Sequence, residues 1–246
     1  MRFEEKIAVV TGAAQGIGAA IAKRLYDEGA RYVALLDISA ERAQAQAKRI
    51  DSRGERAGGF ACDVADGKSA AQVLEAIEAR FGKIDILVNN AGITRDAMFH
   101  KMSAEQWDSV IDVNLGSMFN CCKAIVPGMR ARKYGKIVNL ASVSAFGNIG
   151  QTNYGASKGG VIGFTKCLAR EMARCGCTVN CIAPSYINTE MLRAVPEQTM
   201  QRFLSSIPMG RLGEPEELAA AAAFLCSDDS SFVTGECLVV SGGSYM

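Results

Sequence analysis

Short apolar runs alternate with longer stretches in which apolar residues recur at helical spacing, and this alternation extends over most of the chain. Strand-length runs without a polar face are typical of parallel strands that are covered on both sides. The predicted strands are residues 6–11, 32–37, 59–63, 84–89, 136–140, 178–183 and 237–240. Helices are predicted after the first strand up to Glu28, and then over residues 40–53, 69–80, 103–130 (two helices) and 153–174.

This repeated strand–helix order predicts an α/β fold, namely a single-domain, Rossmann-like, doubly wound parallel sheet flanked by helices. The sequence has no Pro/Ser linker, internal repeat or charge block, so we expect residues 1–246 to form one domain. The helical periodicity fades over residues 189–213, where Pro196, Pro208 and Gly210 interrupt it. We expect this excursion to be a mobile loop that closes over a substrate.

Composition excludes several classes of function. The 246 residues include 27 Lys and Arg against 26 Asp and Glu, a net charge of +1 that argues against nucleic-acid binding through bulk charge. No run approaches about 18 apolar residues, so we expect no contact with a membrane through a spanning helix. Nine cysteines without C-x-x-C spacing, and an N-terminus that leads straight into a strand, predict reduced thiols and a cytoplasmic location.

The chain contains one histidine, His100. A zinc site built on several histidines is therefore excluded, and we expect no metal site. A Ser-His-Asp triad would have to use His100, and the sequence contains no G-x-S-x-G turn to present its nucleophile.

A glycine-rich turn follows the first predicted strand and opens the first predicted helix. Gly12 permits the tight turn, Gly16 lets the backbone approach a pyrophosphate, and Gly18 lets the helix lie against the strand. The N–H groups and positive dipole of a helix N-terminus attract phosphate. The spacing is G-x-x-x-G-x-G rather than G-x-G-x-x-G, and we expect Gln15 and Ile17 to contact the dinucleotide as well. A tight turn without a ligand is the alternative.

Asp37 ends the second predicted strand, where an acidic residue binds the ribose hydroxyls of the adenosine. A carboxylate there repels a 2′-phosphate, and no Lys or Arg stands at positions 13, 14, 15, 38 or 39 to neutralise it. The sequence therefore predicts NAD rather than NADP as the cofactor. The alternative for Asp37 is a helix N-cap. Asp63 and Val64 end the third predicted strand and are expected to face the adenine, with an N-cap role for Asp63 equally open.

Tyr154 and Lys158 stand four residues apart near the start of a predicted helix and so share one face. A phenol with a pKa near 10 is a poor base at neutral pH. A neighbouring ammonium and the positive charge of an oxidised nicotinamide both lower that pKa, which makes Tyr154 a usable general acid/base. Ser142 follows the fifth strand, and its hydroxyl can bind the substrate oxygen. Ser144 is the alternative for this role.

Taken together, these motifs resemble the short-chain dehydrogenase/reductase family from about Lys6 to Gly243. The likeness is carried by residues 11–18 (TGAAQGIG), Asp63, residues 89–92 (NNAG), Asn114, Ser142, Tyr154 and Lys158. It implies that Asn114 holds a water that links Lys158 to solvent, and that Lys158 holds the nicotinamide ribose. The remaining cofactor contacts that it implies are Asn90, Ala91, Gly92, Pro184, Ile187 and Thr189. Ser185 departs from the family, which usually has Gly after this Pro.

Within the family the chain resembles bacterial reductases of 3-oxoacyl thioesters carried by acyl carrier protein or CoA. Residues 93–96 (ITRD), Met98, Trp107 and residues 147–154 (GNIGQTNY) carry this likeness. Two features depart from it. Those reductases usually use NADPH, which Asp37 disfavours, and of their two basic carrier-contact positions only the first is matched, by Lys133, while Cys175 occupies the second.

We therefore expect an NAD(H)-dependent oxidoreductase that interconverts a secondary alcohol and a ketone, with 3-oxoacyl and 3-hydroxyacyl thioesters as the favoured substrates. The alternative is a dehydrogenase of a cyclic alcohol, steroid or sugar, and a more remote one is a non-catalytic NAD-binding regulator. The stretch 118–129 is apolar nearly all round, and Gly159 and Gly163 lie on the helix of Tyr154. These features predict a homo-oligomer, and the family implies a homotetramer.

Overall fold

The computed structural model describes residues 1–193 and 195–246 and contains a seven-stranded, wholly parallel sheet in the order β3-β2-β1-β4-β5-β6-β7. The strands are β1 (Ile7–Thr11), β2 (Tyr32–Asp37), β3 (Ala57–Ala61), β4 (Ile86–Asn89), β5 (Gly135–Leu140), β6 (Cys177–Pro184) and β7 (Cys237–Val240). The order runs outward in both directions from β1 and β4. The fold predicted from the sequence is confirmed.

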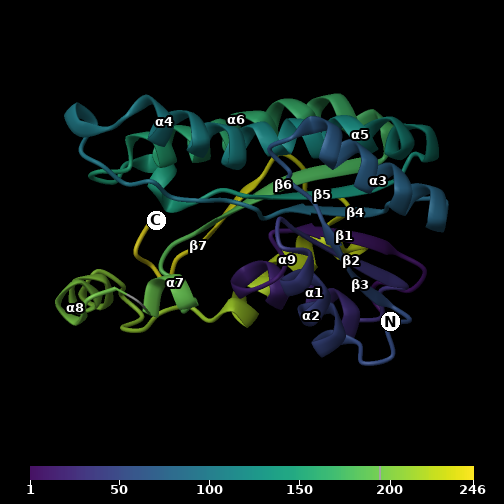
Figure 1. Ribbon diagram of the computed structural model, residues 1–246, viewed down its shortest axis with the longest axis horizontal. Helices are drawn as coiled ribbons and strands as arrows, with labels where there is room; N and C mark the ends of the chain where they lie inside the picture. Colours follow the sequence, from purple (N-terminus) through teal and green to yellow (C-terminus); the bar gives the residue numbers. More distant parts are fainter. Residues whose placement is uncertain (194) are drawn as a thin grey trace.

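Helices cover both faces of the sheet (Figure 1). They are α1 (Gly16–Asp27), α2 (Ala40–Ile50), α3 (Gly67–Phe81), α4 (Ala104–Ile111), α5 (Ser117–Arg132), α6 (Thr152–Met172), α7 (Glu190–Arg193), α8 (Glu197–Ser205) and α9 (Pro215–Cys226). Alternate residues of β1 point to opposite layers: Ala8 and Val10 pack in the core shared with α1 and α9, whereas Ile7 and Val9 pack in the core shared with α3 and α5. This double burial explains why the strands read as continuous apolar runs.

The structure differs from the prediction at the end of one strand, β3, and at two places in the C-terminal third of the chain. β3 ends at Ala61, two residues before the predicted end at residue 63. Ala61 pairs with Asp37, the last residue of β2. The excursion 189–213 contains the helices α7 and α8 rather than an irregular loop. The helix α9 was not predicted at all, although Pro215 in its first turn and the reciprocal capping of Glu214 and Glu217 are N-terminal signals.

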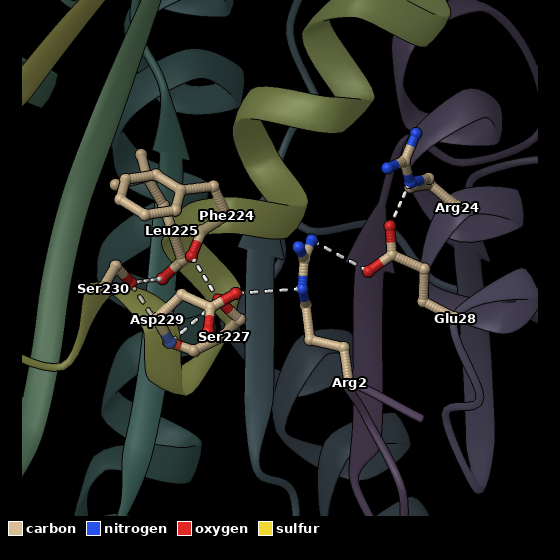
Figure 2. Close-up of polar contacts among 8 residues, drawn as sticks. All are labelled: Arg2, Arg24, Glu28, Phe224, Leu225, Ser227, Asp229 and Ser230. Carbon is tan, nitrogen blue, oxygen red and sulfur yellow. Dashed lines mark hydrogen bonds and ion pairs between the residues drawn. The ribbon is translucent and has the colours of Figure 1, made fainter.

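An ion-pair network joins the start of the chain to the far ends of α1 and α9 (Figure 2). The guanidinium of Arg2 lies 3.0 Å from a carboxylate oxygen of Glu28 and 3.1 Å from one of Asp229. Glu28 also pairs with Arg24 one turn earlier. The network therefore ties the start of the chain to the segments that follow the C-terminal ends of α1 and α9.

No helix in the described part of the chain combines the length and apolar character that crossing a membrane requires.

Candidate active site

A cleft of about 310 Å³ opens at the carboxyl edge of the sheet, beside β1 and β4. Open parallel sheets bind ligands at this edge, where the strand order reverses. Most of the residues predicted for the site line this cleft: Gly12, Gln15, Gly16, Ile17, Asp37, Asn90, Ala91, Gly92, Tyr154, Lys158, Pro184 and Thr189. The prediction did not include Ile93, Thr94, Leu140, Ala141 and Glu190, which also line it.

The glycine-rich turn is packed too closely for side chains at two positions. Gly12 has a φ of +61°, and a Cβ there would lie 2.9 Å from the Cα of Ala91. A Cβ on Gly18 would lie 2.5 Å from the side-chain nitrogen of Asn90. The start of α1 is therefore drawn onto the ends of β1 and β4, and its N-terminal N–H groups face the cleft, as a pyrophosphate site requires.

Asn90 and Thr11 hold this turn together. The amide of Asn90 donates to the main-chain oxygens of Thr11 and Gly12, at 2.9 and 3.0 Å. The hydroxyl oxygen of Thr11 accepts from the main-chain N–H groups of Asn90 and Ala91, both at 3.0 Å. The side chain of Asn90 thus shapes the turn from inside, which the sequence did not reveal.

Asp37 borders the cleft with a carboxylate that main-chain groups hold in place. One oxygen accepts from the N–H of Ala14 at 3.3 Å, and the other accepts from the N–H of Ser39 at 3.2 Å. The N-cap of α2 is Ser39, whose hydroxyl oxygen accepts from the N–H of Arg42. The alternative that Asp37 caps this helix is therefore wrong.

Arg42 is a residue at this rim that the sequence reasoning missed. Its guanidinium contacts the side-chain oxygen of Gln15, the residue that precedes α1. A search for basic residues at positions adjacent to Asp37 could not find it, because Arg42 reaches back from the first turn of α2. Arg42 stands three residues after the N-cap Ser39, and this spacing is the signal that would have placed it in the first turn of α2.

Asp63 and Val64 lie beyond the end of β3 and are not among the residues that line the described cleft. The carboxylate of Asp63 is exposed and accepts from the N–H of Ala65 at 3.0 Å, whereas Val64 is buried. The N-cap of α3 is Asp66, which accepts from the N–H of Lys68. The capping role left open for Asp63 therefore belongs to Asp66.

Tyr154 and Lys158 share one face of α6 at the floor of the cleft, with the ammonium 5.6 Å from the centre of the phenol ring. Burial lowers the pKa of Lys158 to about 8. Burial raises the pKa of Tyr154, the hydroxyl of Ser142 lowers it through a hydrogen bond, and the charge of Asp96 raises it further. In the protein alone the net direction is upward, so the lowering expected for catalysis depends on the charge that a bound cofactor would add.

The two candidate serines differ in what their hydroxyls contact. Ser142 accepts from the N–H of Ser144 at 3.1 Å, and its hydroxyl lowers the pKa of the Tyr154 phenol. The hydroxyl of Ser144 donates to the side-chain oxygen of Gln151 at 3.0 Å. Of the two serines, Ser142 is the one that acts on Tyr154. The spacing from Ser142 to Tyr154 is one residue shorter than is usual in the family that the chain resembles.

Asn114 lies in a π-helical turn (Asp112–Gly116) between α4 and α5 and is fully buried. Its amide donates to the oxygen of Ile93 at 3.0 Å and to the hydroxyl of Ser157 at 3.1 Å, and its oxygen accepts from the N–H of Ile93 at 2.8 Å. A Cβ on Gly92 would lie 3.2 Å from Asn114 Oδ1 and 3.5 Å from Lys158 Nζ. Asn114 and Lys158 thus flank the same glycine, and π-helical turns often occur at functional positions.

The segment 184–190 separates the cleft from a second cavity of about 440 Å³. Pro184 and Thr189 line the cleft, and Thr189 lies against the glycine-rich turn, 3.7 Å from where a Cβ of Gly16 would stand. Ile187 instead lines the second cavity together with Tyr186. Its main-chain oxygen accepts from the N–H of Thr189 at 2.8 Å.

Comparison with known proteins agrees with this geometry. A family model described as Enoyl-(Acyl carrier protein) reductase matches residues 12–245. The chain is 46% identical over 247 residues to the 3-oxoacyl-[acyl-carrier-protein] reductase FabG of Escherichia coli, with 100% of both chains covered. It is 47% identical over 244 residues to the acetoacetyl-CoA reductase of Rhizobium meliloti, with 98% of both covered. The chain therefore belongs to the short-chain dehydrogenase/reductase family, and it is a pyridine-nucleotide-dependent oxidoreductase that acts on CH–OH groups.

Proposed function

We propose that this protein is an NAD(H)-dependent oxidoreductase that interconverts 3-oxoacyl and 3-hydroxyacyl thioesters. The observation that carries the cofactor choice is the carboxylate of Asp37, which two main-chain N–H groups hold at the rim of the cleft. A fixed carboxylate accepts hydrogen bonds from ribose hydroxyls and repels a phosphate in their place. The thioester class is supported by the names of the relatives, an acyl-carrier-protein reductase and a CoA reductase.

The residues present fit a dinucleotide. Gly12 and Gly18 leave no room for side chains at the turn, and the N-terminus of α1 presents N–H groups for the pyrophosphate. Gln15, Gly16 and Ile17 complete this cradle, and Ala91, Gly92, Pro184 and Thr189 line the far end of the cleft. When bound, the nicotinamide supplies or accepts the hydride. We propose that Ile187 contributes through its main chain, and that Asp63 and Val64 lie nearest the adenine.

The protein's own residues would move the proton. In reduction the phenol of Tyr154 donates its proton to the carbonyl oxygen of the substrate, and in oxidation the phenolate accepts it back. Ser142 donates a hydrogen bond to that oxygen and stabilises the negative charge that develops there. The positive charge of a bound oxidised nicotinamide would lower the pKa of Tyr154, Lys158 would hold the nicotinamide ribose, and Asn114 would connect Lys158 to solvent. These four groups come from different elements: Tyr154 and Lys158 from α6, Ser142 from the start of the turn after β5, and Asn114 from the turn between α4 and α5.

The decisive experiment follows the oxidation of NADH, and separately of NADPH, with acetoacetyl-CoA and with acetoacetyl-acyl carrier protein. We expect turnover with NADH that exceeds turnover with NADPH, and loss of turnover in Tyr154→Phe with NADH binding retained. A preference for NADPH would overturn the cofactor assignment. Binding of NADH without turnover of either thioester would overturn the substrate class and direct attention to cyclic alcohols, steroids and sugars.

We also propose a homotetramer in the cytoplasm. The outer surface of α6 carries Gly159 and Gly163, where an added Cβ would meet no atom of the same chain within 4 Å, and Phe119 of α5 is 55% exposed. A flat helical surface with an exposed aromatic ring suits packing against a second copy. Light scattering of the wild type and of Gly159→Leu tests this: we expect a tetramer for the first and smaller species for the second. A monomeric wild type at micromolar concentration would overturn it.

A further inference from the structure

The segment 242–246, which follows β7 at the end of the chain, lines the second cavity together with Tyr186 and Ile187. In Figure 1 the chain end marked C lies between α7 and the loops beside α4, at the carboxyl edge of the sheet. This segment was not part of the predicted site. It contacts three different stretches of chain, and each contact comes from a different residue.

The first contact is an aromatic stack between Tyr245 and Phe146. Their ring centres are 4.3 Å apart and their planes differ by 10°. Phe146 ends the short 3₁₀ helix Val143–Phe146, which begins directly after Ser142. The same turn holds the hydroxyl of Ser142 through the N–H of Ser144. The ring of Tyr245 therefore packs on the short turn that aims Ser142 at Tyr154.

The second contact involves Ser185, the residue that stands where the family usually has glycine. The hydroxyl of Ser244 donates to the hydroxyl oxygen of Ser185 at 2.7 Å. The N–H of Ser185 donates to the main-chain oxygen of Val240 at 3.1 Å. Glycine at position 185 would keep the second of these hydrogen bonds and lose the first, so the serine ties the residue before Tyr245 to the end of β6.

The third contact joins the segment to the end of the excursion 189–213. The N–H of Met209 donates to the main-chain oxygen of Gly242 at 3.1 Å. Gly242 has a φ of +60°, and a Cβ there would lie 2.9 Å from a methyl group of Ile207. Directly before the segment, the hydroxyl of Ser241 donates to the main-chain oxygen of Tyr245 at 3.0 Å, which closes the turn that presents the ring.

The stacked rings add little to the core. Phe146 is 47% exposed and Tyr245 is 38% exposed, and neither belongs to the buried clusters of the described residues. The stack is well defined although both rings are about half exposed, and it lies on the turn that follows Ser142. We therefore attribute it to the active site rather than to the core. Aromatic pairs prefer defined mutual orientations, so the stack restrains where the two rings lie.

We propose that Tyr245 is a positioning residue for Ser142: its ring fixes the Val143–Phe146 turn, and the hydrogen bond between Ser244 and Ser185 holds the ring in place. The inference rests on the proposed function, because it assigns Tyr245 a part in the step that Ser142 and Tyr154 carry out. It also assigns a role to Ser185, the residue that departs from the family pattern: its hydroxyl holds Ser244, the residue before Tyr245.

The test compares Tyr245→Ala, Tyr245→Phe and Ser185→Gly with the wild type, each also combined with Ser142→Ala. Rates are measured in the oxidation of 3-hydroxybutyryl-CoA by NAD across pH. We expect Tyr245→Ala to lower kcat about tenfold or more, Tyr245→Phe to restore it, and Ser185→Gly to fall between them. The apparent pKa of the rate should move upward in Tyr245→Ala and likewise in Ser142→Ala, since Ser142 is what lowers the pKa of Tyr154.

Two further readouts separate positioning from a structural role. In the Ser142→Ala background, Tyr245→Ala should cost no additional kcat, because its effect passes through Ser142. Hydrogen exchange of the Ser144 amide should speed up in Tyr245→Ala and stay slow in Tyr245→Phe. Phe232→Ala, which removes a fully exposed ring elsewhere, is the matched control and should leave both measurements unchanged.

Additive losses in the Ser142→Ala background, or wild-type kcat and Ser144 exchange in Tyr245→Ala, would overturn the inference. If the wild type does not oxidise the thioester, the proposed substrate class fails, and the exchange measurement still decides whether Tyr245 holds the turn.

Discussion

The ammonium of Lys158 donates a hydrogen bond of 2.6 Å to the main-chain oxygen of Leu140, the last residue of β5. Lys158 is 3% exposed, and its burial lowers its pKa from 10.5 to about 8. A base whose pKa is lower in the folded than in the unfolded protein opposes folding while it is charged. This penalty is fully present below about pH 8 and fades as the pH rises towards 10.5.

Lys158→Met should therefore change the pH dependence of stability. The quantity to compare is the free energy of unfolding of the variant minus that of the wild type. This difference should be lower at pH 10 than at pH 7 by roughly 2–3 kcal/mol, because the wild type loses its penalty as the lysine is deprotonated. The hydrogen bond to Leu140 is stronger while the lysine is charged, and this difference is already contained in the shift of the pKa. Urea unfolding at the two pH values measures the difference, and Lys166→Met, on an exposed position of the same helix, is the control. A constant difference would contradict the buried, titrating lysine.

The alanine variants of Ser142 and Ser144 should differ clearly in kcat. Ser142→Ala removes the hydroxyl that lowers the pKa of Tyr154 and is proposed to bind the substrate oxygen, and we expect kcat to fall about 10²–10³-fold, the usual cost of losing one such donor. Ser144→Ala removes a hydroxyl that binds Gln151, and we expect less than about a tenfold loss. Steady-state kinetics with saturating NADH distinguish them, and the reverse order of effects would assign the role to Ser144.

Asn114 should be needed for both stability and turnover. Asn114→Ala leaves the half-buried N–H and oxygen of Ile93 without their partner, which costs up to about 1–3 kcal/mol for each group that water does not reach. Asn120→Ala is the matched control, because that amide also binds two main-chain oxygens, those of Val64 and Ala65, outside the cleft. We expect both variants to unfold at lower urea concentration and only Asn114→Ala to lose kcat at temperatures where both are folded. Equal kcat in the two would contradict a catalytic part for Asn114.

Arg42 should become a determinant of cofactor choice once Asp37 is removed. In the wild type the carboxylate of Asp37 opposes a 2′-phosphate, while the guanidinium of Arg42 lies nearby on Gln15. Asp37→Ser should therefore raise kcat/KM for NADPH about tenfold, a change of about 1.4 kcal/mol. Asp37→Ser combined with Arg42→Ala should lose that gain. If the double variant uses NADPH as well as Asp37→Ser does, Arg42 lies too far from the ribose to matter.

The sequence was sufficient for the sheet because its strands are buried on both faces. Ile7 and Val9 serve one core and Ala8 and Val10 the other, so the apolar run is unbroken. The same reasoning placed β3 two residues late, since Gly58 and Gly59 hide the apolar pattern where the strand passes under Tyr32 and α2. It missed α9, whose Ala-rich, apolar surface shows no helical periodicity although it packs against α1.

For the site, local motifs predicted what lies within one turn or strand end. Gly12, Gly16, Tyr154 and Lys158 could be placed because their spacing fixes their geometry. Contacts between distant segments could not be predicted in this way. Arg42 reaches Gln15 across two elements, and Tyr245 reaches Phe146 across almost a hundred positions of sequence. No periodicity encodes such pairs, because they depend on how the finished fold brings its edges together.

The segment 184–190 borders two spaces at once, the cleft through Pro184 and Thr189 and the second cavity through Tyr186 and Ile187. A change of its backbone that favours a ligand on one side alters the shape of the other side. Thermodynamic reciprocity then requires that each ligand change the affinity of the other by the same factor. A molecule that fills the second cavity should thus appear as an effector of nucleotide affinity, and a calorimetric cycle with both ligands would give one coupling free energy from either direction.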